Sequence, residues 1–368
     1  MGAANQWGLV SWLSPDNDDV TMNPSVIYAL MAAILFGAST PFAKLLVGEV
    51  SPILLAGLLY LGSGIGLSLT RLIRDLGWKP SGLMPPEWPW LIGGIVFGGV
   101  LAPVLLLIGL TVTSGSIASL LLNLEAVLTA LIAWIVFREN ADRRVVLGMV
   151  AIVAGGIVLS WPSGEVSSSN WLGPMAIAAA CFCWAIDNNL TRKVSAADAL
   201  FIAAGKGLIA GTVNCGLALS LDATAPSTII LLKTLSLGLV GYGISLTLFV
   251  LALRGLGTAR TGAYFSTAPF IGAAVALVLL NEATSPAFWL ASGLMGLGVL
   301  LHLTEHHLHE HTHLALEHSH RHVHDVHHQH SHDVDWDSGK PHAHFHQHTE
   351  ISHKHPHYPD IHHRHDHR

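Results

Sequence analysis

The sequence predicts an all-α integral membrane protein with ten transmembrane helices in two inverted repeats of five, followed by a disordered histidine-rich tail. Three observations support this prediction: ten long apolar stretches, the recurrence of the first five stretches in the second five, and an abrupt change of composition after Leu303. Charged residues make up only 11% of the chain. A large soluble helical protein would not need so many long uncharged runs, so this alternative is not favoured.

The ten apolar stretches are long enough to cross a bilayer. An α-helix rises about 1.5 Å per residue, so about 20 apolar residues span a hydrocarbon core about 30 Å thick. Helices are the expected form because each one satisfies its own backbone hydrogen bonds in lipid. The expected spans are 25–47, 52–70, 90–112, 114–137, 145–161, 171–190, 198–220, 229–252, 262–280 and 285–303.

Basic residues in the connections predict the orientation, because Lys and Arg near span ends stay on the cytoplasmic side of a membrane. Connections after odd-numbered spans offer only Lys44 and Lys233. Connections after even-numbered spans hold Arg71, Arg74, Lys79, Arg138, Arg143, Arg144, Arg192, Lys193, Arg254 and Arg260. We therefore expect a multi-pass protein of the cell inner (plasma) membrane with both termini in the cytoplasm.

These assignments divide the chain into five parts. Residues 1–24 are expected to form a cytoplasmic leader, which does not resemble a signal peptide. Residues 25–161 form the first repeat of five helices, and 171–303 form the second, with a linker at 162–170 between them. Residues 304–368 form the tail.

The second half of the membrane region resembles the first half in sequence. At an offset of 148 residues, Lys44 aligns with Arg192 and Gly57 with Gly205. At an offset of 143, Glu139 aligns with Glu282. Because five is an odd number of spans, the second copy must enter the membrane in the opposite sense. This inverted repeat is typical of secondary transporters, which bind their substrate near the midplane between the halves.

The first two spans resemble a known repeat. Phe36-Gly37 followed by Lys44, and then Ser51-Pro52 at the start of the next span, resemble the first two helices of an EamA-type repeat in the drug/metabolite transporter superfamily. The resemblance extends over residues 25–303. It implies a ten-helix secondary transporter that works by alternating access, often an exporter of metabolites or toxic analogues, and it names no substrate.

The fourth helix of each half tests this resemblance. The stretch from Pro269 to Glu282 resembles the fourth helix of the EamA repeat, with a proline inside the helix and a glutamate at its end. Its counterpart in the first half ends correctly at Glu139 but has Ala126 where the proline would fall, preceded by Glu125. The sequence therefore departs from the pattern in the shape and polarity of this helix.

Ionisable residues inside the spans are the strongest candidates for a substrate site. A charge at the centre of a membrane helix costs about 2.5–3.5 kcal/mol on insertion scales, so such residues indicate function by default. Glu125 lies near the middle of span four, Lys206 near the middle of span seven, and Asp187 toward the cytoplasmic end of span six. Lys206 is expected to pair with Glu125 or Asp187, or to bind an anionic group of the substrate. The alternative is a buried ion pair that only fixes helix register.

Polar stripes give further candidates. Thr40 and Lys44 share one face of the first span, and Asn188 and Arg192 are at matching positions in span six. Two pseudo-symmetric stripes would then face one cavity.

Two more polar residues belong to spans four and nine. Asn123 lies two residues before Glu125 and about 200° around the helix, so one or the other faces the cavity more directly. Tyr264 is a candidate in span nine. Gly207 and Gly211 have the small-xxx-small spacing that favours close helix packing.

The tail predicts binding of transition-metal ions. All 25 histidines of the chain lie between His302 and His367, mostly in a His-x-His pattern. Neutral imidazole suits Zn, Ni, Co and Cu(II), and Asp residues of the tail can add oxygen ligands. Tails of this kind resemble those of a subset of EamA-type transporters. The expected ligands are His318, His320, His322, His324, His342, His344, His346 and His348.

Three functions fit these features. The first is export of a small polar or charged metabolite, with the tail as a metal-binding regulator. The second is transport of Ni, Co or Zn, with the tail collecting cargo. In that case the spans offer Asn123, Glu125, Cys181, Cys183 and Asp187 as ligands. The third is a membrane-anchored metal buffer or sensor.

The expected partners are a small-molecule substrate, the lipid bilayer and transition-metal ions, and a homodimer is left open. We expect no nucleic acid partner and no enzymatic activity. No cofactor is required, although Zn, Ni or Co is expected on the tail. The chain has no GxxxxGK[ST] motif for nucleotide binding.

Overall fold

The structure is a computed structural model of the 368-residue chain. It describes residues 24–77, 79–137, 143–161, 171–194 and 197–303, and in the tail 307–313, 316–322, 342–348 and 351–357. Residues 1–23 of the leader, the linker at 162–170, Glu139 and His324 lie outside the described residues.

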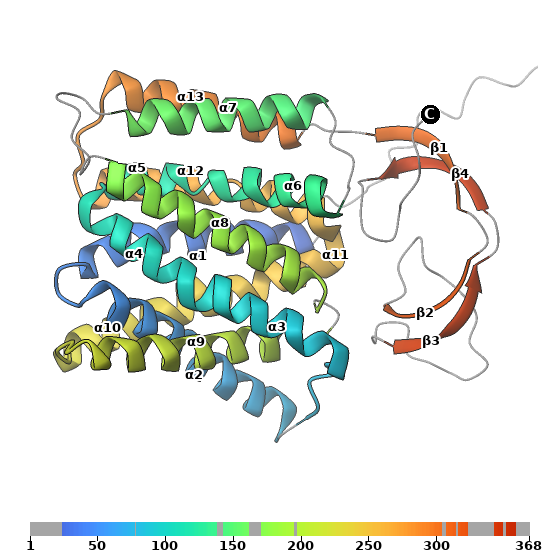
Figure 1. Cartoon of the computed structure of the whole chain (residues 1–368), viewed down its shortest axis with the longest axis horizontal. Helices are drawn as coiled ribbons and strands as arrows, with labels where there is room; N and C mark the ends of the chain where they lie inside the picture. Colours follow the sequence, from blue (N-terminus) through green and yellow to red (C-terminus); the bar gives the residue numbers. More distant parts are fainter. Residues whose placement is uncertain are drawn as a thin grey trace, which may run out of the picture.

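Helices run side by side through one bundle (Figure 1). Those of the first half are α1 (Pro24–Leu46), α2 (Pro52–Asp75), a short 3₁₀ turn η1 (Pro85–Glu87), α3 (Trp88–Gly94), the π-helical segment η2 (Ile95–Leu101), α4 (Ala102–Val112), α5 (Gly115–Leu121), α6 (Leu124–Phe137) and α7 (Arg143–Ser160). Those of the second half are α8 (Leu172–Arg192), α9 (Ala199–Ser220), α10 (Thr228–Leu237), the π-helical segment η4 (Gly238–Ile244), α11 (Ser245–Phe265), α12 (Ala268–Leu279) and α13 (Pro286–Leu303).

Within the described residues, seven helical stretches are long and apolar enough to cross a membrane. They fall on spans one to five, seven and eight of the ten that the sequence predicts. The other three predicted spans are also helical, but α12 and the apolar part of α13 are shorter. The remaining helix, α8, has 21 residues and carries Asp187, Asn188 and Asn189, so its sequence is less apolar. Asp187 and Asn189 are buried in the bundle, and Asn188 is half-buried.

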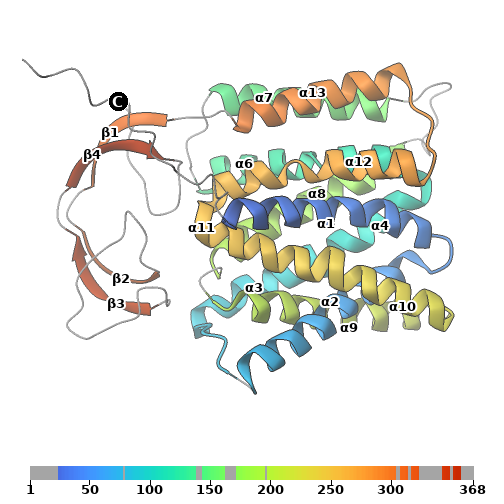
Figure 2. The ribbon, with the colours of Figure 1, turned by 180° about the vertical axis from the view of Figure 1, so that it is seen from behind.

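Helices of the first half pack against helices of the second half in matching pairs. α7 packs against α13 at one edge of the bundle, and α2 packs against α9 at the other (Figures 1 and 2). Between these edges, α1 contacts α11 and α12, whereas α8 contacts α4 and α6. The π-helical segments η2 and η4 begin at Ile95 and Gly238, which are 143 residues apart, an offset that also aligns the halves in the sequence.

Glycines allow α2 and α9 to touch backbone to backbone. A Cβ atom added to Gly211 would lie 2.6 Å from the backbone nitrogen of Leu61, and one added to Gly207 would lie 2.5 Å from that of Gly64. Such close approach replaces the hydrophobic effect as a source of helix association in lipid. The small-xxx-small pair of α9 therefore serves packing, as expected from the sequence.

The start of α9 is fixed by a side-chain cap. The carboxylate of Asp198 accepts hydrogen bonds from the backbone N–H groups of Leu200 and Phe201, at 2.8 and 3.1 Å. The same carboxylate accepts a hydrogen bond from Arg74 of α2 at 2.5 Å. The cap therefore also joins the end of α2 to the start of α9.

Four strands in the tail differ from the expected disorder. β1 (His307–His313) pairs antiparallel with β4 (Ile351–His357), and β2 (Leu316–His322) pairs antiparallel with β3 (His342–His348). The His-x-His pattern has the two-residue period of a strand, so alternate histidines would share one face. In the structure these four segments are paired strands, whereas the sequence predicts a disordered tail.

Candidate functional site

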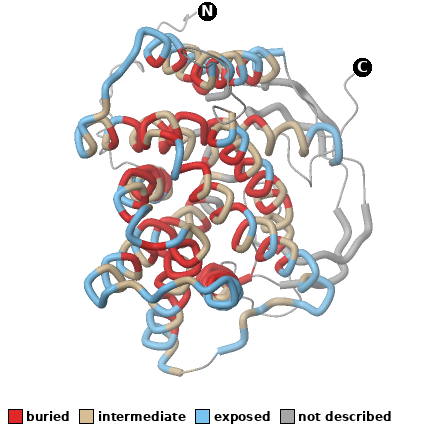
Figure 3. The backbone as a smooth tube through the Cα atoms, turned by 60° about the vertical axis from the view of Figure 1, so that its left-hand side comes forward, coloured by how far each residue is buried: buried red, intermediate tan, exposed pale blue. Residues whose placement is uncertain are grey.

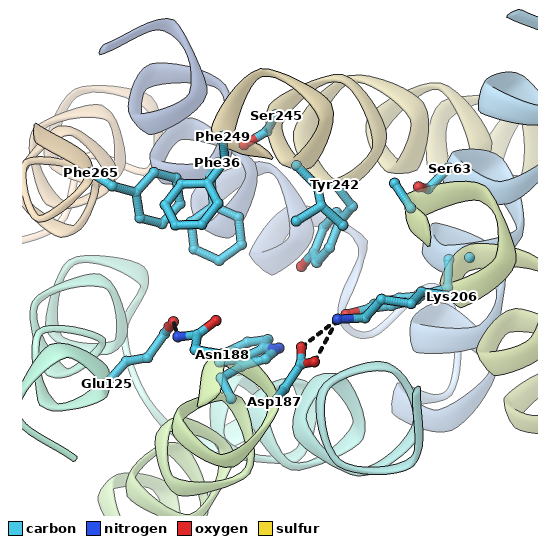
Figure 4. Close-up of a pocket in the computed structure, with 15 residues that line it drawn as sticks. Phe36, Ser63, Glu125, Asp187, Asn188, Lys206, Tyr242, Ser245, Phe249 and Phe265 are labelled. Carbon is cyan, nitrogen blue, oxygen red and sulfur yellow. Dashed lines mark hydrogen bonds and ion pairs between the residues drawn. The ribbon is translucent and has the colours of Figure 1, made fainter. Parts of the chain in front are cut away.

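A pocket lies inside the bundle between α1, α2, α6, α8, α9, η4 and α11. The space inside it that the centre of a water molecule can occupy is about 90 Å³. Buried residues, coloured red in Figure 3, are most frequent on the helices in the middle of the bundle. Figure 4 shows two different walls: polar side chains on one side and aromatic rings across an open gap. The pocket can therefore hold a molecule with both polar and apolar parts.

An ion pair between neighbouring helices forms one end of the polar wall. The ammonium group of Lys206 on α9 donates to both carboxylate oxygens of Asp187 on α8, each at 2.6 Å. It also donates to the hydroxyl of Thr191 at 3.2 Å, and this hydroxyl donates to Asp187 at 2.7 Å. Lys206 and Asp187 are only 4% and 6% exposed. Of the two carboxylates that the sequence offered to Lys206, the structure selects Asp187.

Glycine in the π-helical segment makes room for this pair. A Cβ atom at Gly98 of η2 would lie 1.9 Å from an oxygen of Asp187, so any larger residue would displace the carboxylate. The carbonyl of Gly98 accepts hydrogen bonds from the hydroxyl of Tyr60 at 2.7 Å and from the indole N–H of Trp184 at 3.1 Å. A π-helical segment frees such carbonyls from the regular helix pattern. η2 thus positions two pocket rings as well as the carboxylate.

Glu125 forms the other end of the polar wall. It lies in the first turn of α6, directly after the break that separates α5 from α6 at Leu122 and Asn123. Its carboxylate accepts a hydrogen bond from the side-chain amide of Asn188 at 2.8 Å. A carboxylate in the first turn of a helix interacts favourably with the unpaired N–H groups there. The break therefore places a negative charge at a helix start inside the bundle.

Aromatic rings form the opposite wall. Phe36 of α1 contacts Trp184, Tyr242 and Phe265, with ring centroids 6.2, 6.0 and 5.4 Å apart. Phe249 and Phe265 of α11 contact each other edge to face at 4.8 Å. Tyr60 and Tyr242 are 5.6 Å apart. These contacts fix the rings against one another, because such pairs have preferred geometries.

Four of the eight residues predicted for substrate binding line this pocket: Glu125, Asp187, Asn188 and Lys206. The aromatic wall was missed by sequence reasoning. Phe, Tyr and Trp are common in membrane helices whether they face lipid or a cavity, so no sequence signal separates the two. Only Phe36 carried a hint, through its alignment with Trp184 at the offset of 148 residues.

The other four predicted residues do not line the pocket. Thr40 is buried, three residues after Gly37, which packs against Ala268 of α12. Lys44 donates to the backbone carbonyls of Leu110 and Thr113 at the end of α4. The amide of Asn123 donates to the Leu120 carbonyl at 2.9 Å. Tyr264 lies near the end of α11, outside the lining. Of Asn123 and Glu125, it is therefore Glu125 that faces the cavity.

A metal path through the spans finds no support in the part of the chain that the structure describes. No three His, Cys, Asp or Glu residues there are grouped so that they could hold a metal ion. The thiol of Cys181 faces the Leu121 carbonyl at 3.7 Å. Cys183, four residues before Asp187, does not line the pocket.

Fold and site define a multi-pass membrane protein with an internal polar pocket, the class to which transporters belong. The EamA-like transporter family matches residues 23–161 and again residues 171–304, so the chain belongs to this family. The double match covers both halves of the helical bundle.

Relatives agree with this assignment. An "Uncharacterized transporter" from Methanothermobacter thermautotrophicus is 27% identical over 290 residues, which covers 74% of this chain and 83% of that protein. The "Uncharacterized transporter YyaM" from Bacillus subtilis is 29% identical over 172 residues, covering 45% of this chain and 55% of that protein. A solved structure titled "Crystal structure of protein" shares the fold with a TM-score of 0.57 and 21% identity, covering 76% of this chain and 95% of that one.

Proposed function

We propose that the protein is a secondary transporter that exports a small polar or charged metabolite by alternating access, with the cargo bound in the pocket between the polar and aromatic walls. The observation that best supports this proposal is that four polar or charged side chains line one wall of an internal cavity. They are Glu125, Asn188, Asp187 and Lys206. Charges inside membrane helices are costly, and a mere membrane anchor would not need them around a cavity.

The two matching halves support an inverted repeat of five helices each, ten in all. The same family matches twice, the π-helical segments recur after 143 residues, and α1 and α8 pack against corresponding helices of the opposite half. Repeats of this kind allow one half to rock against the other around a central site. We place both termini in the cytoplasm and the protein in the plasma (inner) membrane, because basic residues gather on one side of the predicted spans.

The tail is proposed to bind transition metals and to regulate transport. In the pairing of β2 with β3, His318 is opposite His346, His320 is opposite His344, and His322 is opposite His342. Opposite residues of an antiparallel pair have Cβ atoms about 4.5–5.5 Å apart, and alternate residues share one face. The register therefore pairs histidine positions across the two strands, which supports the proposal of metal binding.

Flux measurements on cells expressing the full chain test the transport proposal. A screen of metabolites and metal ions should identify a cargo whose export depends on the protein. Glu125→Gln should then abolish export without loss of folded protein from the membrane, because it removes the charge that faces the cavity. The matched control is Glu49→Gln, the same change at an exposed residue beyond the end of α1. Normal export by Glu125→Gln would show that the site is wrong.

A metal-cargo function makes a different prediction in the same screen. Ni, Co or Zn export should then continue in a chain that ends at Leu303, and should be lost in Asp187→Asn. Such a result would replace metabolite export with metal transport as the function.

A further inference from the structure

The charges of the pocket do not balance. Among the described residues that line it, three are charged: Glu125, Asp187 and Lys206. Lys206 and Asp187 neutralise each other through two contacts of 2.6 Å. An ionised Glu125 therefore leaves one negative charge in a cavity inside the membrane region, where an unpaired charge is costly. Among the described lining residues, no positive charge is left to pair with an ionised Glu125.

Lys206 has no capacity left for an anionic cargo. An ammonium group has three N–H donors. Lys206 already has three acceptors, the two oxygens of Asp187 and the hydroxyl of Thr191. A carboxylate or phosphate on the cargo would have to break this buried pair before it could bind.

Glu125 has capacity to spare. A carboxylate can accept about four hydrogen bonds. Among the described residues, Glu125 receives one, from Asn188 to a single oxygen. Its side chain is partly exposed, and Figure 4 shows it across the open gap from Phe36 and Phe265. The free acceptor sites are therefore available to a molecule in the pocket.

The aromatic wall suits the rest of such a molecule. Phe36, Phe249, Phe265 and Tyr242 lie together opposite the polar wall. Aromatic faces attract cations as well as apolar groups. A carboxylate that served only to carry a proton would not need this wall.

From these observations we infer that the cargo is an amphipathic organic cation, with an amino or ammonium group on Glu125 and an apolar or aromatic body against Phe36, Phe249 and Phe265. The inference rests on the proposed transport function and names the substrate class of the same pocket. Asn188 is a positioning residue, because its amide holds one oxygen of Glu125 and leaves the other free.

Three probes of similar size and different charge test this inference. They are 2-phenylethylamine, 2-phenylethanol and 3-phenylpropanoate, which are positive, neutral and negative at pH 7.5. Binding to the full chain in nanodiscs is measured by isothermal titration calorimetry. We expect the amine to bind about tenfold tighter than the alcohol, because a charge-assisted hydrogen bond is stronger than a neutral one, and the anion to bind weakest.

Variants separate the two walls. In Glu125→Gln the preference for the amine should disappear, whereas Glu125→Asp and the control Glu49→Gln should keep it. Phe265→Leu should weaken all three probes by a similar factor, because it alters the wall that holds their common ring. Asn188→Ala should weaken the amine but keep the order of the three probes.

Each other outcome contradicts the inference. Equal or tighter binding of the alcohol or the anion, an unchanged order in Glu125→Gln, or no binding of any probe would show that the cargo is not an amphipathic cation. The transport proposal would still stand if the flux screen finds a cargo whose export needs the pocket. If the full chain moves no cargo at all, the transport proposal fails, and the cation inference fails with it.

Discussion

Lys206 and Asp187 illustrate how a single buried pair limits what the pocket can bind. A pair that has lost one partner leaves an uncompensated charge in a low-dielectric interior, which costs on the order of 3–5 kcal/mol. Both side chains are almost fully buried and bond each other at 2.6 Å. The pair therefore contributes to the fold as well as to the site.

We predict that Lys206→Met destabilises the protein and that adding Asp187→Asn recovers most of the loss, because the double variant leaves no buried charge. Asp187→Asn alone should also destabilise, since it leaves Lys206 unpaired. Thermal unfolding of the purified variants in detergent, followed by circular dichroism, measures the three effects. If the double variant is as unstable as the sum of the single ones, the two residues are not coupled.

Sequence reasoning found the polar wall because charge in an apolar span is conspicuous. Glu125, Asp187 and Lys206 were each identified on this ground, and all three line the pocket. Helical spacing alone was a poorer guide to the residues that line the pocket. Thr40 shares a helical face with Gly37, and a Cβ atom on Gly37 would lie 2.3 Å from the Ala268 carbonyl. That face packs against α12, and the periodicity of a helix does not reveal which face meets a cavity.

At the scale of elements, contact between helices depends on where side chains are missing. Gly211 and Gly216 are both on α9, five residues apart. A Cβ atom on Gly211 would lie 2.6 Å from the backbone nitrogen of Leu61, whereas one on Gly216 would have no neighbour within 4 Å. The two glycines therefore lie on the same helix, but only Gly211 is in close contact with α2.

We predict that Gly211→Ala lowers the stability of the protein by about 1–3 kcal/mol, as is usual for overpacking. Gly216→Ala should leave stability unchanged or raise it slightly, because alanine favours a helix by about 1 kcal/mol over glycine. Thermal unfolding of both variants under the same conditions decides the matter. Equal effects of the two changes would mean that α2 and α9 do not depend on close backbone contact.

The helical character of the membrane region was predictable from the sequence, but the details of its helices were not. Apolar runs located the helices, and the offset of 143 residues matched the spacing of η2 and η4. The π-helical geometry itself has no sequence signal here, because the segments contain the same Gly, Ile, Leu and Val residues as regular membrane helices. The interruption at Leu122 and Asn123 was missed for the same reason, since neither residue is a proline.

At the scale of the whole molecule, the proposed orientation rests on the distribution of Lys and Arg. Ten of these residues lie in connections after even-numbered spans and two lie after odd-numbered ones. We predict that reporters fused after Arg74 and after Leu303 both report a cytoplasmic location. A periplasmic or extracellular signal from either fusion would contradict the orientation and, with it, the inverted repeat.

The histidine-rich tail follows the last helix, so a shortened chain can test whether the tail regulates transport or takes part in it. On the regulatory proposal, a chain that ends at Leu303 should keep nearly full maximal export of the organic cargo and lose only its response to metal. Export assays with and without added Zn measure both properties. Loss of most export in the shortened chain would show that the tail belongs to the transport machinery.

Metal binding itself should depend on pH and on strand register. The full chain should bind several Ni or Zn ions at pH 7.5 and release them near pH 5, because protons compete for imidazole nitrogens around a reference pKa of about 6.5. Within the β2 and β3 pairing, His318, His320, His344 and His346 occupy two neighbouring opposed pairs. Changing these four to Asn should remove more high-affinity metal, measured by calorimetry, than changing His327, His328, His330 and His332, which lie outside the described strands. Equal losses would mean that only the number of histidines matters and that the pairing of the strands plays no part in binding.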